Sequence, residues 1–436
     1  MPPLRGGGTS TTPFLVYLVA LCAFSHPSIA QDRSLEGEVE QYLLATEKTA
    51  DGGQRMEAHW DKGLHFRTPD GSFEFDLNGL FLFDLAWRGS SDFDAADTPN
   101  ETGVRAARLG FFGHAYHNFL YKLQVDFANS DSQLKDAYMG LRNLGAGLKL
   151  LAGHFKEPFG LEALTSRANT LFMERSAATD AFAPGFNAGL LLTNNESFHL
   201  AERVLPAKLV GRTRVTGAVG VFQTTDSSVS ATDGDASITA RLAWMIDVNQ
   251  ERHALLHGAI AYSYRGDDTV RYNDRSGFAD TGSMSVSSSQ LLALEFTAIA
   301  GGFTVAVEYF YTSERQETGP NTNFHGGYAK IGYWITGEEQ GWRLDRYIAT
   351  IPDKNLLDED GGGGTGGFWI GYRFGALDLN DGDIRGGEQY VHTVGGIWRW
   401  NANARVMLNL VLQDVRDGPN GSGDIHQLTL RFQFNF

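Results

Sequence analysis

Cysteine is nearly absent from this sequence, and the one that occurs, Cys22, lies in a segment that we expect to be removed. Residues 1–30 carry Arg5, an apolar stretch from Phe14 to Phe24 and the small-x-small triplet Ser28-Ile29-Ala30, in the order of a secretory signal peptide. The apolar stretch is too short for a spanning helix, and a short buried helix is the alternative interpretation. Without this leader the chain holds no thiol, which excludes disulfides, zinc–thiolate sites and cysteine nucleophiles.

Charged residues are also scarce, and those of one sign are in excess. They make up 20% of the chain, with 52 acidic and 36 basic residues and a formal net charge of −16. A chain with this balance does not attract polyanions as a whole, so we exclude nucleic acid as a partner. Any preference for anions must therefore come from the local placement of basic side chains.

Long hydrophobic runs are missing after the leader, because no stretch reaches the roughly twenty apolar residues that a spanning helix needs. Proline is infrequent, with 12 residues, whereas glycine contributes 52 residues and aromatic residues 12% of the chain. This composition favours strands and turns over helices. The sequence therefore predicts an all-β protein.

What is present is a repeated alternation of apolar and polar residues. LTLRFQFNF (428–436) alternates Leu or Phe with Thr, Arg, Gln and Asn, and SFEFDLNGLFLFDLAW (72–87) follows the same pattern. Successive side chains of a strand point to opposite faces, so each stretch predicts a strand with one apolar and one polar face. Sixteen strands are predicted in this way, at 72–87, 104–115, 119–128, 135–142, 148–155, 188–204, 209–223, 236–247, 253–264, 288–299, 303–313, 326–336, 367–376, 390–400, 404–413 and 424–436.

The predicted strands are long, and their connections alternate in length. Crossing a bilayer needs strands of about nine to eleven residues, whereas strands of a soluble sandwich, the alternative, have about five or six. Tight links at 116–118, 143–147, 300–302 and 401–403 are interleaved with long ones at 88–103, 156–187, 265–287, 314–325 and 377–389. We therefore predict a sixteen-stranded antiparallel transmembrane β-barrel of the outer-membrane type over residues 56–436. Residues 31–55 form a short periplasmic helix or a linker, and 337–366 is long where a short turn is expected.

Four further stretches carry a family likeness. They are GHFKEPFGLEALTSRANTLFMERS (153–176), GGYAKIGYWITGE (326–338), FWIGYRFGALDLNDGD (368–383) followed by Gly386-Gly387, and VGGIWRWNANARVMLNLV (394–411). In this order they resemble the phosphate-selective porin O and P family. The resemblance implies a trimeric outer-membrane channel for anions, in which the segment beginning HFKEPFG folds into the lumen and narrows the pore.

The long connection 156–187 holds the candidates for contact with a permeating anion at the constriction: Lys156, Arg167 and Arg175. Charged side chains at a narrow point select ions because the dielectric is low there and the ion has lost part of its water. In the alternative interpretation, Glu174 and Arg175 pair with other charges of the loop and only hold it in place.

Basic residues on the polar face of the strands are further candidates, which would form a track along the lumen: Lys122, Arg142, Lys149, Arg241, Arg373, Arg405 and Arg431. Acidic residues share that face, so the wall is mixed, as a plain water-filled barrel also requires. The family resemblance implies a separate role for the terminal Phe436, as an assembly signal that the barrel-insertion machinery reads.

The enzyme motifs G-x-S-x-G, H-E-x-x-H and G-x-x-x-x-G-K-[ST] do not occur in the sequence. We therefore expect a passive outer-membrane porin for small inorganic anions, phosphate or polyphosphate among them, without catalytic residues, cofactor or metal. Its partners would be outer-membrane lipid, the barrel-assembly machinery and further copies in a homotrimer. The alternatives are a general or cation-preferring porin, an outer-membrane hydrolase and a structural, surface-binding barrel.

Overall fold

The computed structural model describes residues 55–91, 93, 100–128, 132–145, 147–194, 212–224, 236–266, 268–357 and 363–436. The predicted signal peptide, 1–30, lies outside these ranges, and so does the predicted helical or linker segment, 31–55, apart from Arg55. Within the described ranges, no helix has the length and apolar character needed to cross a membrane.

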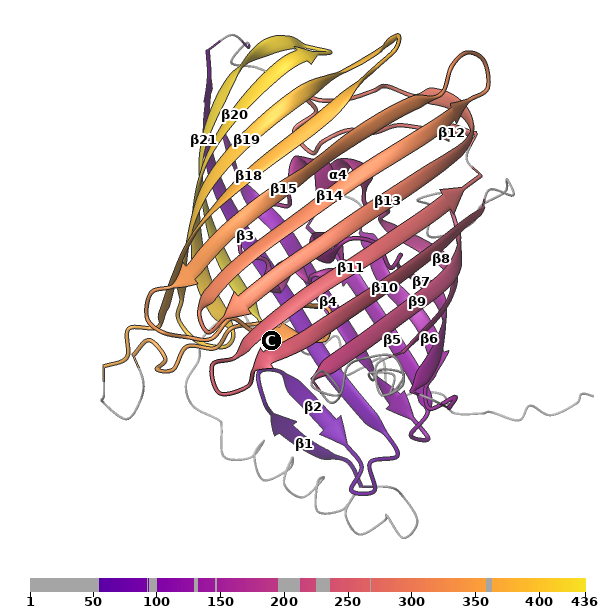
Figure 1. The fold of residues 1–436 in the computed structure, drawn as a ribbon. Coiled ribbons are helices and arrows are strands. Elements are labelled where there is room, and N and C mark those ends of the chain that lie inside the picture. The colour runs from indigo at the N-terminus through magenta and orange to yellow at the C-terminus, as the bar shows by residue number, and fades with distance from the viewer. Residues whose placement is uncertain are drawn as a thin grey trace, which may run out of the picture. The chain divides into compact units, whose positions relative to one another are not determined.

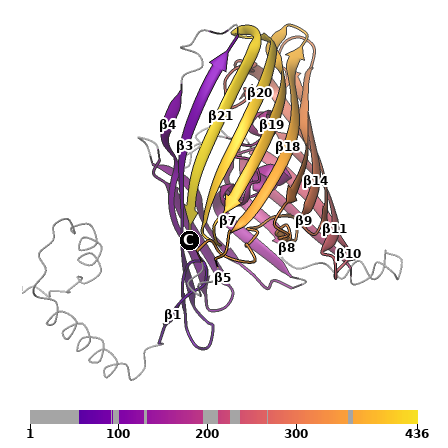
Figure 2. The same ribbon diagram turned by 90° about the vertical axis from the view of Figure 1, so that its left-hand side faces the viewer.

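The described chain forms a closed antiparallel barrel (Figure 1). Each strand pairs with the next along the barrel wall, and the ring closes between the first and last wall strands, β3 and β21, which lie side by side in Figure 2. The sixteen wall strands are β3 (Glu74–Ser90), β4 (Glu101–Ala115), β5 (Phe119–Asp126), β6 (Gln133–Leu141), β7 (Leu148–Lys156), β8 (Phe186–Asn194), β9 (Thr213–Gln223), β10 (Ala236–Asn249), β11 (Ala254–Arg265), β13 (Met284–Ala300), β14 (Phe303–Gln316), β15 (Thr322–Trp334), β18 (Gly367–Asp381), β19 (Ile384–Arg399), β20 (Ala404–Gly418) and β21 (Gly421–Asn435).

The sixteen predicted strands are confirmed, although residues 195–204 and 209–211 of two of them lie outside the described residues. Two predicted connections are wrong. Residues 377–389 were expected to form a long loop, whereas β18 and β19 continue to pair until Asp381 lies opposite Ile384. Only Gly382 and Asp383 join the two strands. The strands were predicted from the alternation of apolar and polar residues, and the polar DLNDGD stretch does not alternate. The backbone hydrogen bonds between β18 and β19 nevertheless continue through it. The connection 314–325 shortens in the same way, to 317–321.

The two ends of the barrel differ in their connections. Tight turns lie at the end that holds the C-terminus, which we call the turn end (Figure 1). The long connections 157–185 and 266–283 lie at the opposite end, the loop end. In outer-membrane barrels the short turns face the periplasm, so the turn end is the periplasmic end.

A short hairpin at the turn end has no counterpart in the sequence prediction. It consists of β1 (Glu57–Trp60) and β2 (Leu64–Arg67), and β2 pairs onto the start of β3. His65 lies opposite Asp76 in this pairing, and their side chains are hydrogen-bonded. Strands of four residues are too short for alternation to reveal them.

Alternation sorts the wall into an outward apolar face and an inward polar face. On β21, Phe432 and Phe434 are 41% and 48% exposed, whereas Arg431 and Gln433 between and beside them are 1% and 4% exposed. The exposed apolar side chains form the lipid-facing surface of the barrel. The inward polar side chains are buried because two segments of the chain fill part of the lumen.

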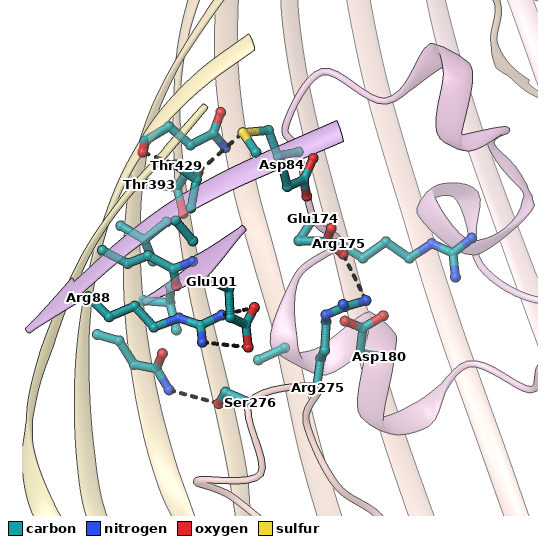
Figure 3. A pocket seen from close by; sticks show the side chains of 18 of the residues that line it. Asp84, Arg88, Glu101, Glu174, Arg175, Asp180, Arg275, Ser276, Thr393 and Thr429 are labelled. Carbon is teal, nitrogen blue, oxygen red and sulfur yellow. Dashed lines mark hydrogen bonds and ion pairs between the residues drawn. The ribbon is translucent and has the colours of Figure 1, made fainter. Parts of the chain in front are cut away.

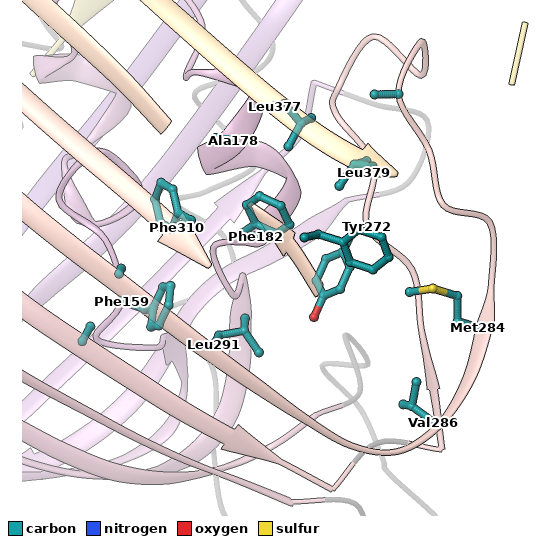
Figure 4. Close-up of a cluster of buried hydrophobic side chains, with 14 residues drawn as sticks. Phe159, Ala178, Phe182, Tyr272, Met284, Val286, Leu291, Phe310, Leu377 and Leu379 are labelled. Carbon is teal, nitrogen blue, oxygen red and sulfur yellow. The ribbon is translucent and has the colours of Figure 1, made fainter. Parts of the chain in front are cut away.

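The first of these segments is the constriction loop, residues 157–185, which contains α3 (Leu161–Leu164), the 3₁₀ helix η1 (Arg167–Asn169) and α4 (Ala177–Phe182). Figure 4 shows Phe182 of α4 beside Phe310 of the wall and Tyr272 of the loop-end connection, which also contains β12 (Thr269–Val270). The ring centroid of Phe182 lies 5.3 Å from that of Tyr272 and 6.3 Å from that of Phe310. This apolar packing holds α4 against β14, β15 and β18.

The second segment that fills the lumen belongs to the stretch 337–366, and its inward fold explains why this stretch is long. Of its described residues, 337–357 fold inward and contain the short hairpin of β16 (Trp342–Arg343) and β17 (Arg346–Tyr347). We call residues 337–357 the turn-end segment. Tyr347 is buried in one cluster with Phe172 of the constriction loop and Trp334 of the wall. The turn-end segment and the constriction loop therefore pack against the same part of the lumen.

Candidate functional site

Glu162 fixes the middle of the constriction loop. Its carboxylate lies 3.1 Å from the guanidinium of Arg373 on β18 and 3.8 Å from the ammonium of Lys330 on β15. It also accepts a hydrogen bond from the backbone N–H of Ser176, at 2.8 Å, so α3, the start of α4 and the wall meet there. Burial would raise the pKa of Glu162, but the charges of Arg373 and Lys330 outweigh it and lower the pKa. The carboxylate therefore stays charged at neutral pH.

Glu174 is the centre of a second ionic cluster. It lies 2.6 Å from Arg431, 3.0 Å from Arg105, 3.3 Å from Arg275 and 3.8 Å from Arg167. Figure 3 shows Glu174 beside Arg275. Burial would raise the pKa of Glu174, but the charges of Arg431 and Arg105 lower it to about 2. Three of the four partners lie outside the constriction loop, so Glu174 ties this loop to the barrel rather than only to itself.

Three of the predicted lumen residues, Arg373, Arg405 and Arg431, also face the constriction loop. Each guanidinium donates a hydrogen bond to a main-chain carbonyl of that loop, and the acceptors are Glu174, Thr170 and Met173, respectively. The first two bonds measure 3.0 Å and 2.9 Å. These arginines satisfy carbonyl groups that would otherwise be buried without a partner. Their contacts make them supports of the constriction loop.

Asp345 holds the turn-end segment to the wall. Its carboxylate lies 2.5 Å from Arg241 of β10 and 2.9 Å from Arg346. Arg241, another predicted lumen candidate, also lies 2.6 Å from Glu295 of β13, so two carboxylates engage it. Burial would raise the pKa of Asp345, but the charges of Arg346 and Arg241 hold that pKa well below its usual range.

The cavity on the loop-end side of the constriction loop, which we call the loop-end chamber, has a volume of about 550 Å³. Five basic and five acidic residues line it, so its formal charge is zero. Figure 3 shows Arg175, Arg275, Asp84, Asp180 and Glu174 around this space, with Thr393 and Thr429 on the neighbouring wall. The other charged lining residues are Arg88, Arg105, Arg373, Glu101 and Asp274.

The cavity on the turn-end side, the turn-end chamber, measures about 540 Å³ and is strongly basic. Its lining includes two acidic residues, Asp136 and Asp345, and eight basic residues: Arg108, Lys122, Lys149, Lys156, Arg167, Arg241, Arg343 and Arg346. Asp126, Glu295 and Glu174 pair with Arg108, Arg241 and Arg167 and offset three of these charges. Eight basic residues against five acidic ones leave a formal excess of three positive charges.

The three predicted constriction residues lie together at the constriction loop. Lys156 and Arg175 both donate to the carbonyl of Ala163, at 2.5 Å and 3.0 Å. Lys156 lines the turn-end chamber and Arg175 the loop-end chamber, so the two cations meet across the loop. Among the described residues, neither has a carboxylate within 4 Å. Arg167 lines the turn-end chamber from η1, and burial lowers its pKa to about 10, which leaves it charged at neutral pH.

The remaining predicted lumen residues divide into two groups. Lys122 and Lys149 line the turn-end chamber, and Lys122 lies 2.8 Å from Asp136. Arg142 does not lie on the lumen wall, contrary to the prediction. Because β6 ends at Leu141, Arg142 falls in the following turn, where its guanidinium donates to the carbonyl of His117.

Six basic residues of the chambers were not predicted from the sequence: Arg88, Arg105, Arg108, Arg275, Arg343 and Arg346. Arg105 and Arg108 are three residues apart, so strict alternation would place them on opposite faces of β4. A β-bulge at Arg105, where the register with β3 shifts, lets both reach the lumen. Arg343 and Arg346 belong to the turn-end segment, whose inward fold no local pattern marks. The bulge has no sequence signal of its own.

The two chambers place fixed charges around a confined space. Cations aimed into a narrow, partly desolvated cavity stabilise an anion that passes and repel a cation. In the described part of the chain, no group of three or more His, Cys, Asp or Glu residues is placed to hold a metal ion.

Known proteins are similar to this chain in sequence. Residues 87–436 match the family described as phosphate-selective porin O and P. Porin O of Pseudomonas aeruginosa is 21% identical over 411 residues, which cover 83% of this chain and 88% of that protein. An uncharacterized protein of Caulobacter vibrioides is 28% identical over 339 residues, or 74% of this chain, and the match spans 64% of that protein's length.

Solved structures share the fold at low sequence identity. An anion-selective porin from Comamonas acidovorans has a TM-score of 0.51 at 9% identity, covering 83% of this chain and 99% of the porin. The outer-membrane protein OmpT of Vibrio cholerae has a TM-score of 0.51 at 11% identity, covering 83% and 98%. The barrel is thus that of outer-membrane porins, and the family match runs from within β3 to the last residue. The resemblance noted in the sequence is confirmed: the chain belongs to the phosphate-selective porin O and P family and is an outer-membrane channel.

Proposed function

We propose that this outer-membrane channel passes small inorganic anions by diffusion, prefers them to cations, and admits phosphate and polyphosphate. The observation that carries the proposal is the excess of basic residues in the turn-end chamber. A cavity lined by one sign of charge and walled by protein raises the local concentration of counter-ions. Any solute that crosses the barrel on this side of the constriction loop meets that field.

The negative net charge of the whole chain does not oppose this preference. Exposed charges more than about 8–10 Å away are largely screened at physiological salt. The lining cations act on a solute at contact distance and in a lower dielectric, where each interaction is several times stronger. Local placement therefore decides the selectivity, and the net charge of −16 does not.

Lys156 is the residue that we assign to contact with the permeating anion at the constriction, with Arg167 and Arg175 beside it. The ammonium of Lys156 is bonded to the Ala163 carbonyl, which is neutral, so no carboxylate cancels its charge there. Arg175 shares that carbonyl from the other chamber. An anion that leaves one chamber would therefore contact the cation of the other chamber before it loses contact with the cation of the first.

Charge reversal tests this assignment. In planar bilayers under a KCl gradient, Lys156→Glu is expected to lower the chloride-over-potassium permeability ratio several-fold. The matched control is Lys62→Glu, because Lys62 is an exposed lysine in the turn of the β1–β2 hairpin and lines neither chamber. A permeability ratio unchanged by Lys156→Glu would remove Lys156 from the pathway.

The assembly of the channel is part of the same proposal. We propose that residues 1–30 are cleaved during export, that the barrel-assembly machinery inserts the mature chain, and that three copies form a homotrimer in outer-membrane lipid. Support comes from the order of features in the leader and from the family resemblance. Mass determination of the purified, detergent-solubilised protein tests two of these points, because it reports both the N-terminal residue and the number of subunits.

A further inference from the structure

The turn-end chamber is unusual for a water-filled lumen because apolar side chains line it together with the cations. They come from three separate parts of the chain: Leu151, Phe155, Phe186 and Leu191 from the wall, Leu164 from the constriction loop and Ile348 from the turn-end segment. Ile348 is 38% exposed although it sits inside the barrel. Apolar surface that faces a cavity from several sides is a feature of sites that bind organic ligands.

The loop-end chamber shows that aromatic lining is a local feature and not a property of the whole lumen. No aromatic residue occurs among the described residues that line it, whereas the turn-end chamber has Tyr138, Phe155, Phe186 and Tyr347. Two cavities of nearly equal volume in one barrel thus differ in both charge and aromatic content. A channel for inorganic ions alone would gain nothing from the second difference.

Cations and rings are in contact in the turn-end chamber. The ammonium of Lys156 lies 5.5 Å from the ring centroid of Phe186. The Phe155 and Tyr138 rings meet edge to face, with centroids 5.7 Å apart. An anionic group next to Lys156 would therefore bring any attached ring against the apolar wall.

We propose that the turn-end chamber binds organic anions that carry an aromatic or similarly compact apolar group, such as aryl phosphates and aryl carboxylates. The anionic end pairs with the cations near Lys156 and Arg167, and the apolar end packs between the wall and Ile348. The inference rests on the proposed anion preference, because the basic residues must attract the anionic end. It adds to that function a class of solute defined by its apolar part.

The test compares phenyl phosphate with inorganic phosphate as blockers of chloride current through single channels. The two carry the same phosphate group and, in mildly alkaline buffer, the same charge. Burial of the ring is expected to lower the half-blocking concentration of phenyl phosphate about tenfold below that of phosphate. Equal half-blocking concentrations would overturn the inference.

Variants locate the effect. Ile348→Ser is expected to reduce the tenfold difference to about threefold, because it removes one apolar side of the site. Leu164→Ser, on the constriction loop, serves if the first variant fails to insert. Val391→Ser is the matched control, since Val391 is an apolar residue that lines the loop-end chamber. If Val391→Ser reduced the ratio of the two half-blocking concentrations as much as Ile348→Ser does, the site would lie in the loop-end chamber. That result would overturn the assignment.

The reversal potential of the same channels separates this inference from the proposed function. An anion-preferring channel that phenyl phosphate and phosphate block equally overturns the organic-anion site alone. A cation-preferring channel overturns the proposed function and this inference with it. Anion preference with stronger block by phenyl phosphate supports both.

Discussion

At the scale of single residues, Arg431 shows how the barrel uses its buried cations. It lies on the closing strand β21 opposite Asp84 of β3, and its guanidinium contacts that carboxylate at 2.6 Å and 2.7 Å. The same group lies 2.6 Å from Glu174. One side chain thus joins the two strands that close the barrel and holds the constriction loop to them.

Replacing this residue should therefore weaken the barrel and the loop together. Arg431→Met removes the charge at similar volume and leaves two carboxylates without their main partner. Both carboxylates are partly exposed, so we expect a loss of about 2 kcal/mol rather than the larger cost of a fully buried pair. The temperature at which the folded band disappears in heat-modifiability gels should fall. Arg67→Met, which breaks an exposed pair with Glu74, is the control and should leave that temperature unchanged.

Asp180 of α4 should make the selectivity depend on pH. Burial, followed by the charge of Glu174, raises its pKa to about 6. Above that pH the carboxylate is charged and adds a negative charge to the loop-end chamber, and below it the carboxylate is neutral. The chloride-over-potassium permeability ratio should therefore rise as pH falls through about 6. Asp180→Asn should remove this step, and an identical pH profile in that variant would contradict the assignment.

The raised pKa of Asp180 also makes the stability of the fold depend on pH, and proton linkage fixes the direction of that dependence. The folded pKa of about 6 lies above the ordinary value of 3.8, so between these values the folded state binds more protons than the unfolded state. Stability therefore decreases as pH rises through this window. Asp180→Asn should be less sensitive to pH there.

Residue placement was predictable where alternation holds. The inward position of Arg373, Arg405 and Arg431 follows from their phase in the strands. Their partners do not, because these lie about 200 residues or more away along the chain in a loop without periodic structure. The opposite case is Arg105, which a bulge turns inward against its phase.

At the scale of elements, the turn-end segment is the feature that the sequence analysis left open. Its contacts hold it inside the lumen, where we expect it to narrow the path: Tyr347 packs edge to face against Trp342 of the same segment, with centroids 4.9 Å apart, and Asp345 is paired with the wall. Loosening this segment without changing its charge should widen the path. Tyr347→Ser is expected to raise single-channel conductance while anion preference persists. Ile351→Ser, an exposed position in the same segment, should conduct like the parent, and equal conductance in both variants would contradict a constricting role.

Phe436, directly after β21, is the residue that the family resemblance implies as an assembly signal. Phe436 pairs with Gly79 through two backbone hydrogen bonds of 2.8 Å and 3.1 Å, and a Cβ at residue 79 would come within 2.4 Å of its ring. Deleting Phe436 should reduce outer-membrane yield more than it alters the conductance of the channels that insert. Gly79→Val, which displaces the ring but keeps the terminal residue, distinguishes packing from signal. Equal yields of the parent and the deletion variant would refute the signal.

The elements themselves were predictable because each strand spans the bilayer and so repeats its pattern over many residues. The prediction fails where an element does not span the bilayer or does not repeat the pattern. The four-residue strands β1 and β2 lie outside the membrane zone, and the DLNDGD end of β18 pairs without an apolar face. The inward fold of 337–357 depends on Tyr347 and Asp345 finding distant partners, which a single sequence does not display.

At the scale of the whole molecule, the distribution of charge matters more than its sum. A chain of net charge −16 encloses one formally neutral chamber and one with an excess of positive charge. The sequence phase alone suggested a uniformly mixed wall. The separation into two chambers arises from the constriction loop and the turn-end segment, which divide the lumen and contribute Arg167, Arg343 and Arg346 to one side of it.

The central claim is that this separation makes the channel anion-preferring. The most direct test is the reversal potential of the unmodified protein in a planar bilayer under a KCl gradient, followed by titration with phosphate. The account predicts a reversal potential of the sign set by chloride permeation, with a chloride current that phosphate reduces. A reversal potential of the sign set by potassium would contradict it.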